Sequence, residues 1–126
     1  MAAPELRLKT EFSADNVVIP SEKATSMALV LNEMLQNCFD HAFTGRTQGA
    51  ISVELKKTES GCRLGGRFAV CDDGNGLPPG FNGILQSSLG LRIIKTMAEA
   101  DLHGTFKIEN RPQGGTCAEV AIPLGG

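Results

Sequence analysis

One amphipathic stretch, residues 27–42, constrains the fold of this chain more than any other segment. When its side chains are placed about 100° apart, the apolar and polar residues separate onto opposite faces. The apolar face comprises Met27, Leu31, Met34, Leu35, Cys38, Phe39 and Ala42. The polar face comprises Glu33, Gln36, Asn37, Asp40 and His41. The pattern predicts a long helix, from Ser21 to about Ala42, that packs one side on a hydrophobic core.

The polar face of this helix differs from an ordinary solvent-facing stripe, because it contains no lysine. It places the carboxylate of Glu33 and the amide of Asn37 one turn apart, with the imidazole of His41 one turn further along. The face is either a solvated helix surface with arbitrary polar residues or a site for a magnesium-bound phosphate. The other motifs of the chain decide between these interpretations.

The size and charge of the chain restrict its class. With 126 residues it is expected to form a single domain over residues 1–126, with residues 1–5 as a linker. The formal net charge of −2 gives no electrostatic reason to expect binding to nucleic acid or to an anionic membrane. No apolar run approaches the roughly 20 residues of a membrane span. The N-terminus does not have the pattern of a signal peptide. A cytoplasmic location is therefore expected.

Four cysteines are scattered along the chain without a CxxC motif or a paired histidine. They are Cys38, Cys62, Cys71 and Cys117. This spacing predicts reduced thiols rather than a disulfide framework or a zinc site.

The remaining pattern predicts an α/β domain. Strands are expected at Leu6–Phe12, Asn16–Ile19, Ala50–Lys57, Arg67–Cys71, Thr105–Asn110 and Thr116–Pro123. Ser21 is expected to cap the long helix, and a second helix is expected over Leu89–Ala100 with Leu91, Ile94 and Met97/Ala98 as its apolar face. A turn at Glu59–Gly61 indicates an antiparallel hairpin, and Asp72–Ser88 is too polar and too rich in Gly and Pro for a regular element.

Two further motifs carry chemistry at the edges of these elements. The first is Asp72 at the end of a strand, followed by Gly74 and Gly76 in a D-x-G-x-G turn; the carboxylate can accept a hydrogen bond from an exocyclic amine, and the glycines let a ligand approach the backbone. The second is Ser88-Leu89-Gly90-Leu91 at the start of the second helix, where unpaired N–H groups suit an anion. Each motif alone is common in turns and helix starts.

The order of these motifs, followed by Gly114-Gly115-Thr116 before the last strand, resembles the ATP-binding signature of the GHKL superfamily. That superfamily comprises gyrase, heat-shock chaperones, histidine kinases and MutL-type proteins. The chain most resembles the catalytic domain of bacterial sensor histidine kinases with a short lid, over about Leu6 to Leu124. The resemblance implies a two-layer α/β sandwich of the Bergerat type, a mixed sheet with helices on one face.

The resemblance also implies roles for particular residues. Asn37 would coordinate Mg²⁺, and Glu33 would act as the catalytic group near the γ-phosphate of ATP. Asp72 would hold the adenine amino group with the help of Thr116, and Gly74 and Gly76 would hinge the lid. The other residues expected at the nucleotide are His41, Ser88, Leu89, Gly90 and Leu91.

The sequence departs from the family pattern at some positions. Histidine kinases often have a basic residue where Asp40 stands, so His41 or Arg92 would have to supply the positive charge. Ser88 stands where many relatives have glycine, and no clear phenylalanine box lies in the short lid, although Phe81 is present.

The resemblance implies a histidine kinase that transfers the γ-phosphate of Mg-ATP to a histidine on a separate dimerisation domain, with a response regulator downstream. His41 lies on the expected nucleotide face and His103 in a helix-ending turn, so neither is expected to be the phosphoacceptor. The alternatives are a free-standing anti-sigma-factor-type serine kinase and a non-enzymatic nucleotide sensor. The gyrase and MutL branches are disfavoured because no transducer domain accompanies these residues.

Overall fold

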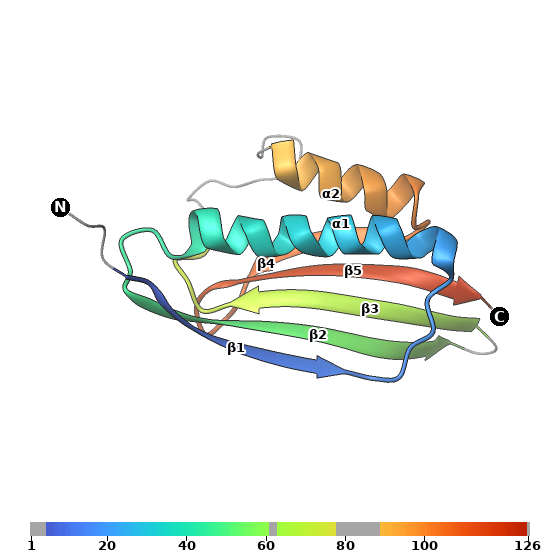
Figure 1. The fold of residues 1–126 in the computed structure, drawn as a ribbon, viewed down its shortest axis with the longest axis horizontal. Coiled ribbons are helices and arrows are strands. Elements are labelled where there is room, and N and C mark those ends of the chain that lie inside the picture. Colours follow the sequence, from blue (N-terminus) through green and yellow to red (C-terminus); the bar gives the residue numbers. More distant parts are fainter. Residues whose placement is uncertain (1–4, 61–62, 78–88, 126) are drawn as a thin grey trace.

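Both helices pack on one face of a five-stranded sheet (Figure 1). The computed structural model describes residues 5–60, 63–77 and 89–125. The strands are β1 (Arg7–Ala14), β2 (Gln48–Ser60), β3 (Arg63–Asp72), β4 (Thr105–Asn110) and β5 (Thr116–Gly125). The helices are α1 (Ser21–Asn37), the short π-helical segment η1 (Cys38–Ala42) that continues it, and α2 (Leu89–Ala100). None of the described helices is long and apolar enough to cross a membrane.

The sheet is mixed, with the strand order β1-β2-β3-β5-β4. β1 pairs with β2 in parallel, and the other three neighbouring pairs are antiparallel. This arrangement confirms the predicted two-layer α/β sandwich with helices on one face. The antiparallel β2–β3 hairpin is also confirmed, but it is longer than predicted. Glu59 and Ser60 belong to β2, and β3 begins at Arg63 because Ser60 pairs with Arg63.

The core lies between the helices and the sheet. Its buried apolar side chains are Val30, Met34, Cys38, Ala42, Phe43, Ile51, Phe68, Val70, Leu91, Ile94, Ala98, Leu102, Ala118, Val120 and Ile122. In β3 and β5 these residues alternate with more exposed ones, as expected for strands buried on one side. Each large apolar side chain that is fully buried contributes about 1.5–3 kcal/mol to stability.

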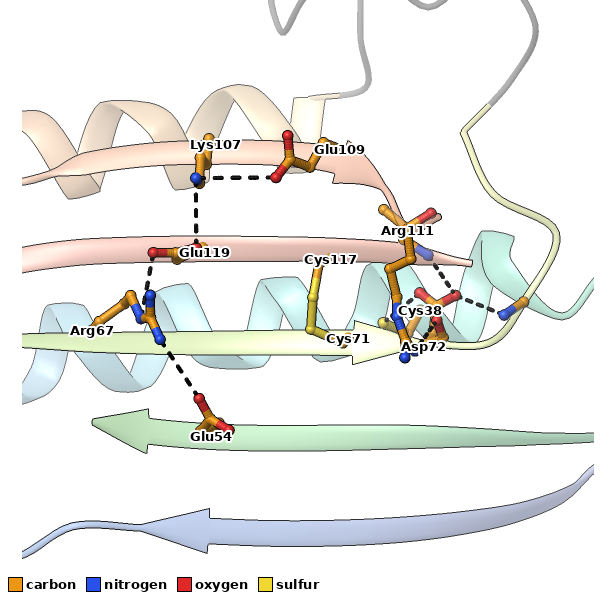
Figure 2. The surroundings of a disulfide bond; sticks show 12 residues. Cys38, Glu54, Arg67, Cys71, Asp72, Lys107, Glu109, Arg111, Cys117 and Glu119 are labelled. Carbon is orange, nitrogen blue, oxygen red and sulfur yellow. Dashed lines mark hydrogen bonds and ion pairs between the residues drawn. A yellow bond between two sulfur atoms is a disulfide. The ribbon is translucent and has the colours of Figure 1, made fainter. Parts of the chain in front are cut away.

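The opposite face of the sheet is polar and carries a row of ion pairs across four strands (Figure 2). Arg67 on β3 pairs with Glu54 at 3.8 Å and with Glu119 at 3.5 Å. Lys107 on β4 pairs with Glu119 at 3.9 Å and with Glu109 at 4.0 Å. Since these side chains are partly or largely exposed, each pair contributes little to stability, and their main effect is to keep this face hydrated.

The predicted strand at Asn16–Ile19 is wrong, because this segment is an irregular link. The pairing of β1 ends where the N–H of Asp15 donates to the Leu55 carbonyl and the Asp15 carboxylate accepts from the N–H of Lys57, both at 2.9 Å. From there the chain leaves the sheet for the helix layer (Figure 1), and Val18 is 83% exposed.

The long helix begins at Ser21 as predicted, but its N-cap and its last turn differ from the prediction. Pro20 occupies the N-cap position without a side-chain hydrogen bond, so the predicted serine cap is wrong. At the other end, the α-helix changes to the π-helix η1. A π-helix has more residues per turn, so the side chains after Asn37 no longer follow the α-helical spacing. Phe39, which was predicted on the apolar face, is consequently 49% exposed.

The second helix matches its prediction, with Leu91, Ile94 and Ala98 buried. It ends in the predicted turn, where the N–H of Gly104 donates to the carbonyl of Ala98 at 2.8 Å. His103 has a φ of 55° there and is exposed, so this histidine belongs to the end of the helix.

The prediction of reduced thiols is wrong for Cys71 and Cys117, which form a disulfide between β3 and β5 (Figure 2). The two residues are 46 positions apart in sequence and directly opposed in the sheet. Their spacing gave no signal, because only the register of β3 against β5 brings them together. Cys38 keeps a free thiol and is buried in the core. Cys62 lies outside the described residues.

Candidate functional site

The segments that carry the sequence motifs gather at one end of the molecule. The end of α1 with η1, the end of β3 and the start of α2 all lie at the same end of the sandwich (Figure 1). The N–H of Asn75, which follows β3, donates to the carbonyl of Ala42 in η1 at 2.7 Å. The N–H of Leu77 donates to Oδ1 of Asn110 at the end of β4 at 2.8 Å. The loop after β3 is thus tied both to the helix layer and to the sheet.

Asp72 is the last residue of β3 and is only 3% exposed. Its Oδ1 accepts hydrogen bonds from the N–H of Gly74 at 2.8 Å and from the N–H of Thr116 at 3.3 Å. Its Oδ2 accepts from the thiol of Cys38 at 3.5 Å. A carboxylate has about four acceptor positions. These three donors fix the orientation of the carboxylate, and among the described residues no further donor occupies the second acceptor position of Oδ2.

Cys38 was assigned by its helical spacing to the hydrophobic core, and its contact with Asp72 was missed. Burial raises the pKa of this thiol from 9.0 to about 12, and the charge of Asp72 and the hydrogen bond to it act in the same direction. The thiol is therefore protonated at neutral pH and available as a donor. No sequence pattern signalled this contact, because Cys38 and Asp72 lie 34 positions apart and only the packing of the helix end on the strand end brings them together.

The main chain of Asp72 is also held from the turn between β4 and β5. Nη1 of Arg111 donates to the carbonyl oxygen of Asp72 at 3.0 Å. Gly115 has a φ of +91°, and a Cβ at this position would overlap the Asp72 carbonyl oxygen. The Gly114-Gly115-Thr116 motif thus lets the turn approach β3 closely. Arg111 was not singled out from the sequence, since a basic residue in a polar turn is common.

The two glycines of the D-x-G-x-G motif serve different purposes. A Cβ on Gly74 would overlap the carbonyl oxygen of Ala42, so this glycine lets the loop pass close to η1. Gly76 has a φ of +84°, which favours glycine. The hinge role predicted for both stays a prediction, because the expected lid at residues 78–88 lies outside the described residues, together with Phe81 and Ser88.

Glu33 and Asn37 are half-buried on one stripe of α1. Ser26 lies on the same stripe, seven residues before Glu33, and its hydroxyl donates to Oδ2 of Asp101 just after α2 at 3.1 Å. The stripe therefore faces α2. Asn37 also adjoins Cys38 in the chain, and so lies one residue from the contact with Asp72.

His41 and its neighbour Asp40 are both exposed on η1, and Asp40 accepts a hydrogen bond from Nε2 of Gln36 at 3.0 Å. Within the described residues, no group of three or more His, Cys, Asp or Glu side chains is arranged to hold a metal ion. A divalent cation bound through Asn37 would therefore need oxygen atoms from a ligand and from water.

The start of α2 provides a helix N-terminus on the same side of the sheet (Figure 1). Leu89 is 71% exposed and Gly90 is half-buried. The side chain of Leu91 is only 5% exposed and packs in the core, so the predicted ligand contact of this residue is limited to its main chain. The first turn of a helix of 12 residues suits an anion.

Comparison with known proteins identifies the family. Residues 22–126 match the family described as histidine kinase-, DNA gyrase B- and HSP90-like ATPase. The chain belongs to this ATPase family. This family membership confirms the predicted superfamily and implies that the domain binds ATP.

Two curated relatives of this ATPase domain are histidine kinases. The sensor histidine kinase PdtaS of Mycolicibacterium smegmatis is 33% identical over 109 residues, which are 86% of this chain and 21% of that protein. The blue-light-activated histidine kinase 2 of Erythrobacter litoralis is 32% identical over 120 residues, or 93% of this chain and 32% of that protein. The chain thus spans only a fifth to a third of these relatives.

Solved structures show the same ATPase fold. The EL346 blue-light-activated histidine kinase of Erythrobacter litoralis has a TM-score of 0.79 and 32% identity, over 93% of this chain and 35% of that one. Histidine kinase ThkA, solved in complex with the response regulator TrrA, has a TM-score of 0.71 at 23% identity, over 93% of this chain and 34% of that one. The second likeness is evidence for the fold alone.

Proposed function

We propose that this chain is the ATP-binding catalytic domain of a sensor histidine kinase, which transfers the γ-phosphate of Mg-ATP to a histidine on a separate dimerisation domain. The observation that carries the proposal is the buried carboxylate of Asp72, which three donors orient and whose Oδ2 keeps an acceptor position that no donor in the described part of the chain occupies. Relatives named as histidine kinases, one of them as a sensor histidine kinase, match most of the chain.

Adenine recognition is assigned to Asp72 and Thr116. The exocyclic amine of adenine is a donor, and Oδ2 of Asp72 is an acceptor with its orientation already fixed. Guanine has a carbonyl oxygen at the corresponding position, so a buried carboxylate would repel it. The N–H of Thr116 holds Oδ1 and thereby keeps Oδ2 directed to the base.

The phosphates are assigned to the stripe of α1 that faces α2. Asn37 and Glu33 offer an amide oxygen and a carboxylate, the hard oxygen ligands that Mg²⁺ prefers, so the donor set fits this ion. When bound, Mg²⁺ neutralises charge on the phosphates. Asn37 would hold the ion, and Glu33, one turn earlier, would orient the acceptor at the γ-phosphate.

The helix N-terminus at Leu89 and Gly90 would receive phosphate oxygens through main-chain N–H groups. Phosphoryl transfer requires mainly positioning and charge neutralisation. Because Asp40 is acidic, the positive charge near the phosphates would come from His41 or Arg92, both of which are exposed.

The phosphoacceptor is assigned to another domain. His41 is on η1 at the proposed nucleotide site, and His103 is in the turn that ends α2, so neither is proposed as the phosphoacceptor. The partners are accordingly a histidine-bearing dimerisation domain and a response regulator, in the cytoplasm. The relatives reported above are histidine kinases, so the comparisons give no support to the serine kinase alternative.

Radiolabelled ATP tests this function. The chain is mixed with Mg-[γ-³²P]ATP and with a histidine-bearing dimerisation domain of a sensor histidine kinase, and the labelled protein is treated with acid. An acid-labile label on that domain, and none on this chain alone, is expected. An acid-stable label on serine would support the alternative kinase, and the absence of any transfer despite ATP binding would favour a nucleotide sensor.

A further inference from the structure

The disulfide between Cys71 and Cys117 lies on the sheet face away from the helices (Figure 2). The residues on either side of Cys71 in β3, Val70 and Asp72, are buried at 1% and 3% exposure, so Cys71 points to the opposite face. Both cysteines are partly exposed there. The sulfur atoms are therefore within reach of small thiols and disulfides in solution.

This disulfide is also the last cross-link before β3 and β5 separate. Cys71 and Cys117 form the final pair of their ladder. The next residue along β3 is Asp72, and the residue before Cys117 is Thr116, whose N–H donates to the carboxylate of Asp72 at 3.3 Å. The disulfide consequently joins the two strands one residue from the two groups that are assigned to adenine.

We propose that Cys71 and Cys117 are a site of reversible thiol oxidation that sets the affinity of the domain for ATP. The disulfide holds Asp72 and Thr116 in register, so the oxidised form binds the nucleotide with a preorganised carboxylate. Reduction leaves the ends of β3 and β5 joined only by hydrogen bonds, and ordering them then costs free energy on binding. The inference rests on the proposed function, because it assigns the adenine contact to Asp72.

The chemistry is thiol–disulfide exchange with a low-molecular-weight disulfide. The thiolate of one cysteine attacks that disulfide, forms a mixed disulfide and releases one small thiol. The second cysteine then displaces the other small thiol. The two cysteines lose two electrons and two protons, and one small disulfide becomes two thiols. In a reducing cytoplasm such a pair is expected to be transient rather than structural.

The third described cysteine does not take part in this exchange. Cys38 is 7% exposed and lies in the core between the helices and the sheet, where its thiol donates to Asp72. Its burial keeps the sulfur atom away from small disulfides in solution. Oxidation is therefore directed to the Cys71–Cys117 pair.

Calorimetric titration with Mg-ATP tests the inference. The chain is measured after equilibration with glutathione disulfide and again after reduction with dithiothreitol, and peptide mass spectrometry establishes the state of the pair. We expect the dissociation constant for Mg-ATP to rise about threefold or more on reduction. Equal affinities in the two states, tighter binding by the reduced form, or failure of the pair to form with glutathione disulfide would each overturn the inference.

Two variants separate the pair from other thiols. Cys117→Ser is expected to bind Mg-ATP like the reduced protein under both conditions, and Cys62→Ser is the matched control that should keep the full response. A redox response that persists in Cys117→Ser would contradict the assignment. If Cys117→Ser does not fold, the Mg-ATP affinities of the oxidised and reduced forms of the unaltered chain still test the inference. Absence of Mg-ATP binding in both states would instead overturn the proposed function itself.

Discussion

The thiol of Cys38 lies 3.5 Å from Oδ2 of Asp72 and joins the end of the first helix to the end of β3. Asn37 immediately precedes Cys38 in the chain, so this contact brings the segment that carries the proposed magnesium ligand to the proposed adenine acceptor. The β4–β5 turn holds the other side of Asp72 through Thr116 and Arg111. The site is therefore built where the helix layer and the sheet meet, and its parts can be tested separately.

Replacing Asp72 with asparagine should weaken ATP binding by about tenfold or more, because hydrogen bonds to charged groups contribute about 1.5–3 kcal/mol. It should also reduce the preference for ATP over GTP, since the repulsion of the guanine carbonyl is lost. Competition binding with ATP and GTP measures both the affinity for ATP and the preference over GTP. Asp73→Asn is the matched control: Asp73 is exposed and its Oδ1 accepts from the N–H of Ala50, so nucleotide binding should stay unchanged.

Replacing Asn37 with alanine should remove the dependence of ATP binding on Mg²⁺ and lower phosphotransfer by about 10²–10³-fold, the usual cost of one positioned polar group. Titration with ATP in the presence of Mg²⁺ and of a chelator measures the first effect. Asn32→Ala is the control, because Asn32 is exposed on the opposite side of α1. Binding by Asn37→Ala that responds to Mg²⁺ like the unaltered chain would refute the assignment.

The thiol of Cys38 should make stability depend on alkaline pH. Its pKa is raised from 9.0 in the unfolded chain to about 12 in the folded one, so the folded state binds this proton more tightly. The stabilisation is complete below pH 9 and is lost as the pH rises toward about 12, at about 1.4 kcal/mol per pH unit. Urea denaturation of the reduced chain between pH 8 and 10.5 measures the free energy of unfolding.

Cys38→Ser is the reference for that measurement, because serine does not titrate in this pH range. The variant keeps every lysine, so the effect of lysine titration is the same in both proteins. The difference in stability between the two proteins should shrink steadily above pH 9. A constant difference would show that the thiol titrates normally in the folded state. Iodoacetamide at pH 8 should likewise leave Cys38 unmodified until the protein is unfolded.

Replacing Gly74 with alanine should destabilise the chain by about 1–3 kcal/mol, because the added Cβ would overlap the carbonyl oxygen of Ala42 and force the loop away from η1. ATP affinity should fall with it, since the N–H of Gly74 donates to Asp72 at 2.8 Å. Thermal denaturation and ATP titration measure the two effects. Gly66→Ala is a suitable control, because its Cβ would meet only side-chain atoms of Leu124 and Ile122, the nearest of them Cδ1 of Leu124 at 3.0 Å. If Gly74→Ala and Gly66→Ala lowered stability and ATP affinity equally, the close approach of Gly74 to Ala42 would be contradicted.

The parts of the fold that depend on local periodicity were predicted well from the sequence. The apolar spacing of Leu91, Ile94 and Ala98 predicted α2 and its buried face. The exposed position of Phe39 could not be predicted, because the sequence pattern was read with α-helical spacing and the chain changes to a π-helix at Cys38. The segment at Asn16–Ile19 is apolar enough for a strand, but the sheet offers it no position once the chain turns toward the helices.

In the candidate site, likewise, the sequence predicted local motifs but not the contacts between distant segments. Asp72, Gly74 and Thr116 were identified by their motifs, and the structure brings them into contact. The contributions of Cys38 and Arg111, and the disulfide between Cys71 and Cys117, depend on contacts between segments more than 30 residues apart. Single-sequence patterns do not report such contacts, because the register of β3 against β5 is fixed only when the sheet forms.

A crystal structure of the chain with Mg²⁺ and a non-hydrolysable ATP analogue would show whether one nucleotide contacts both Asp72 and Asn37. We predict that a single nucleotide spans the site, with its adenine amine within hydrogen-bond distance of Oδ2 of Asp72 and its magnesium ion bound to the side-chain oxygen of Asn37. A nucleotide whose base lies away from Asp72, or whose metal ion is held without Asn37, would contradict it.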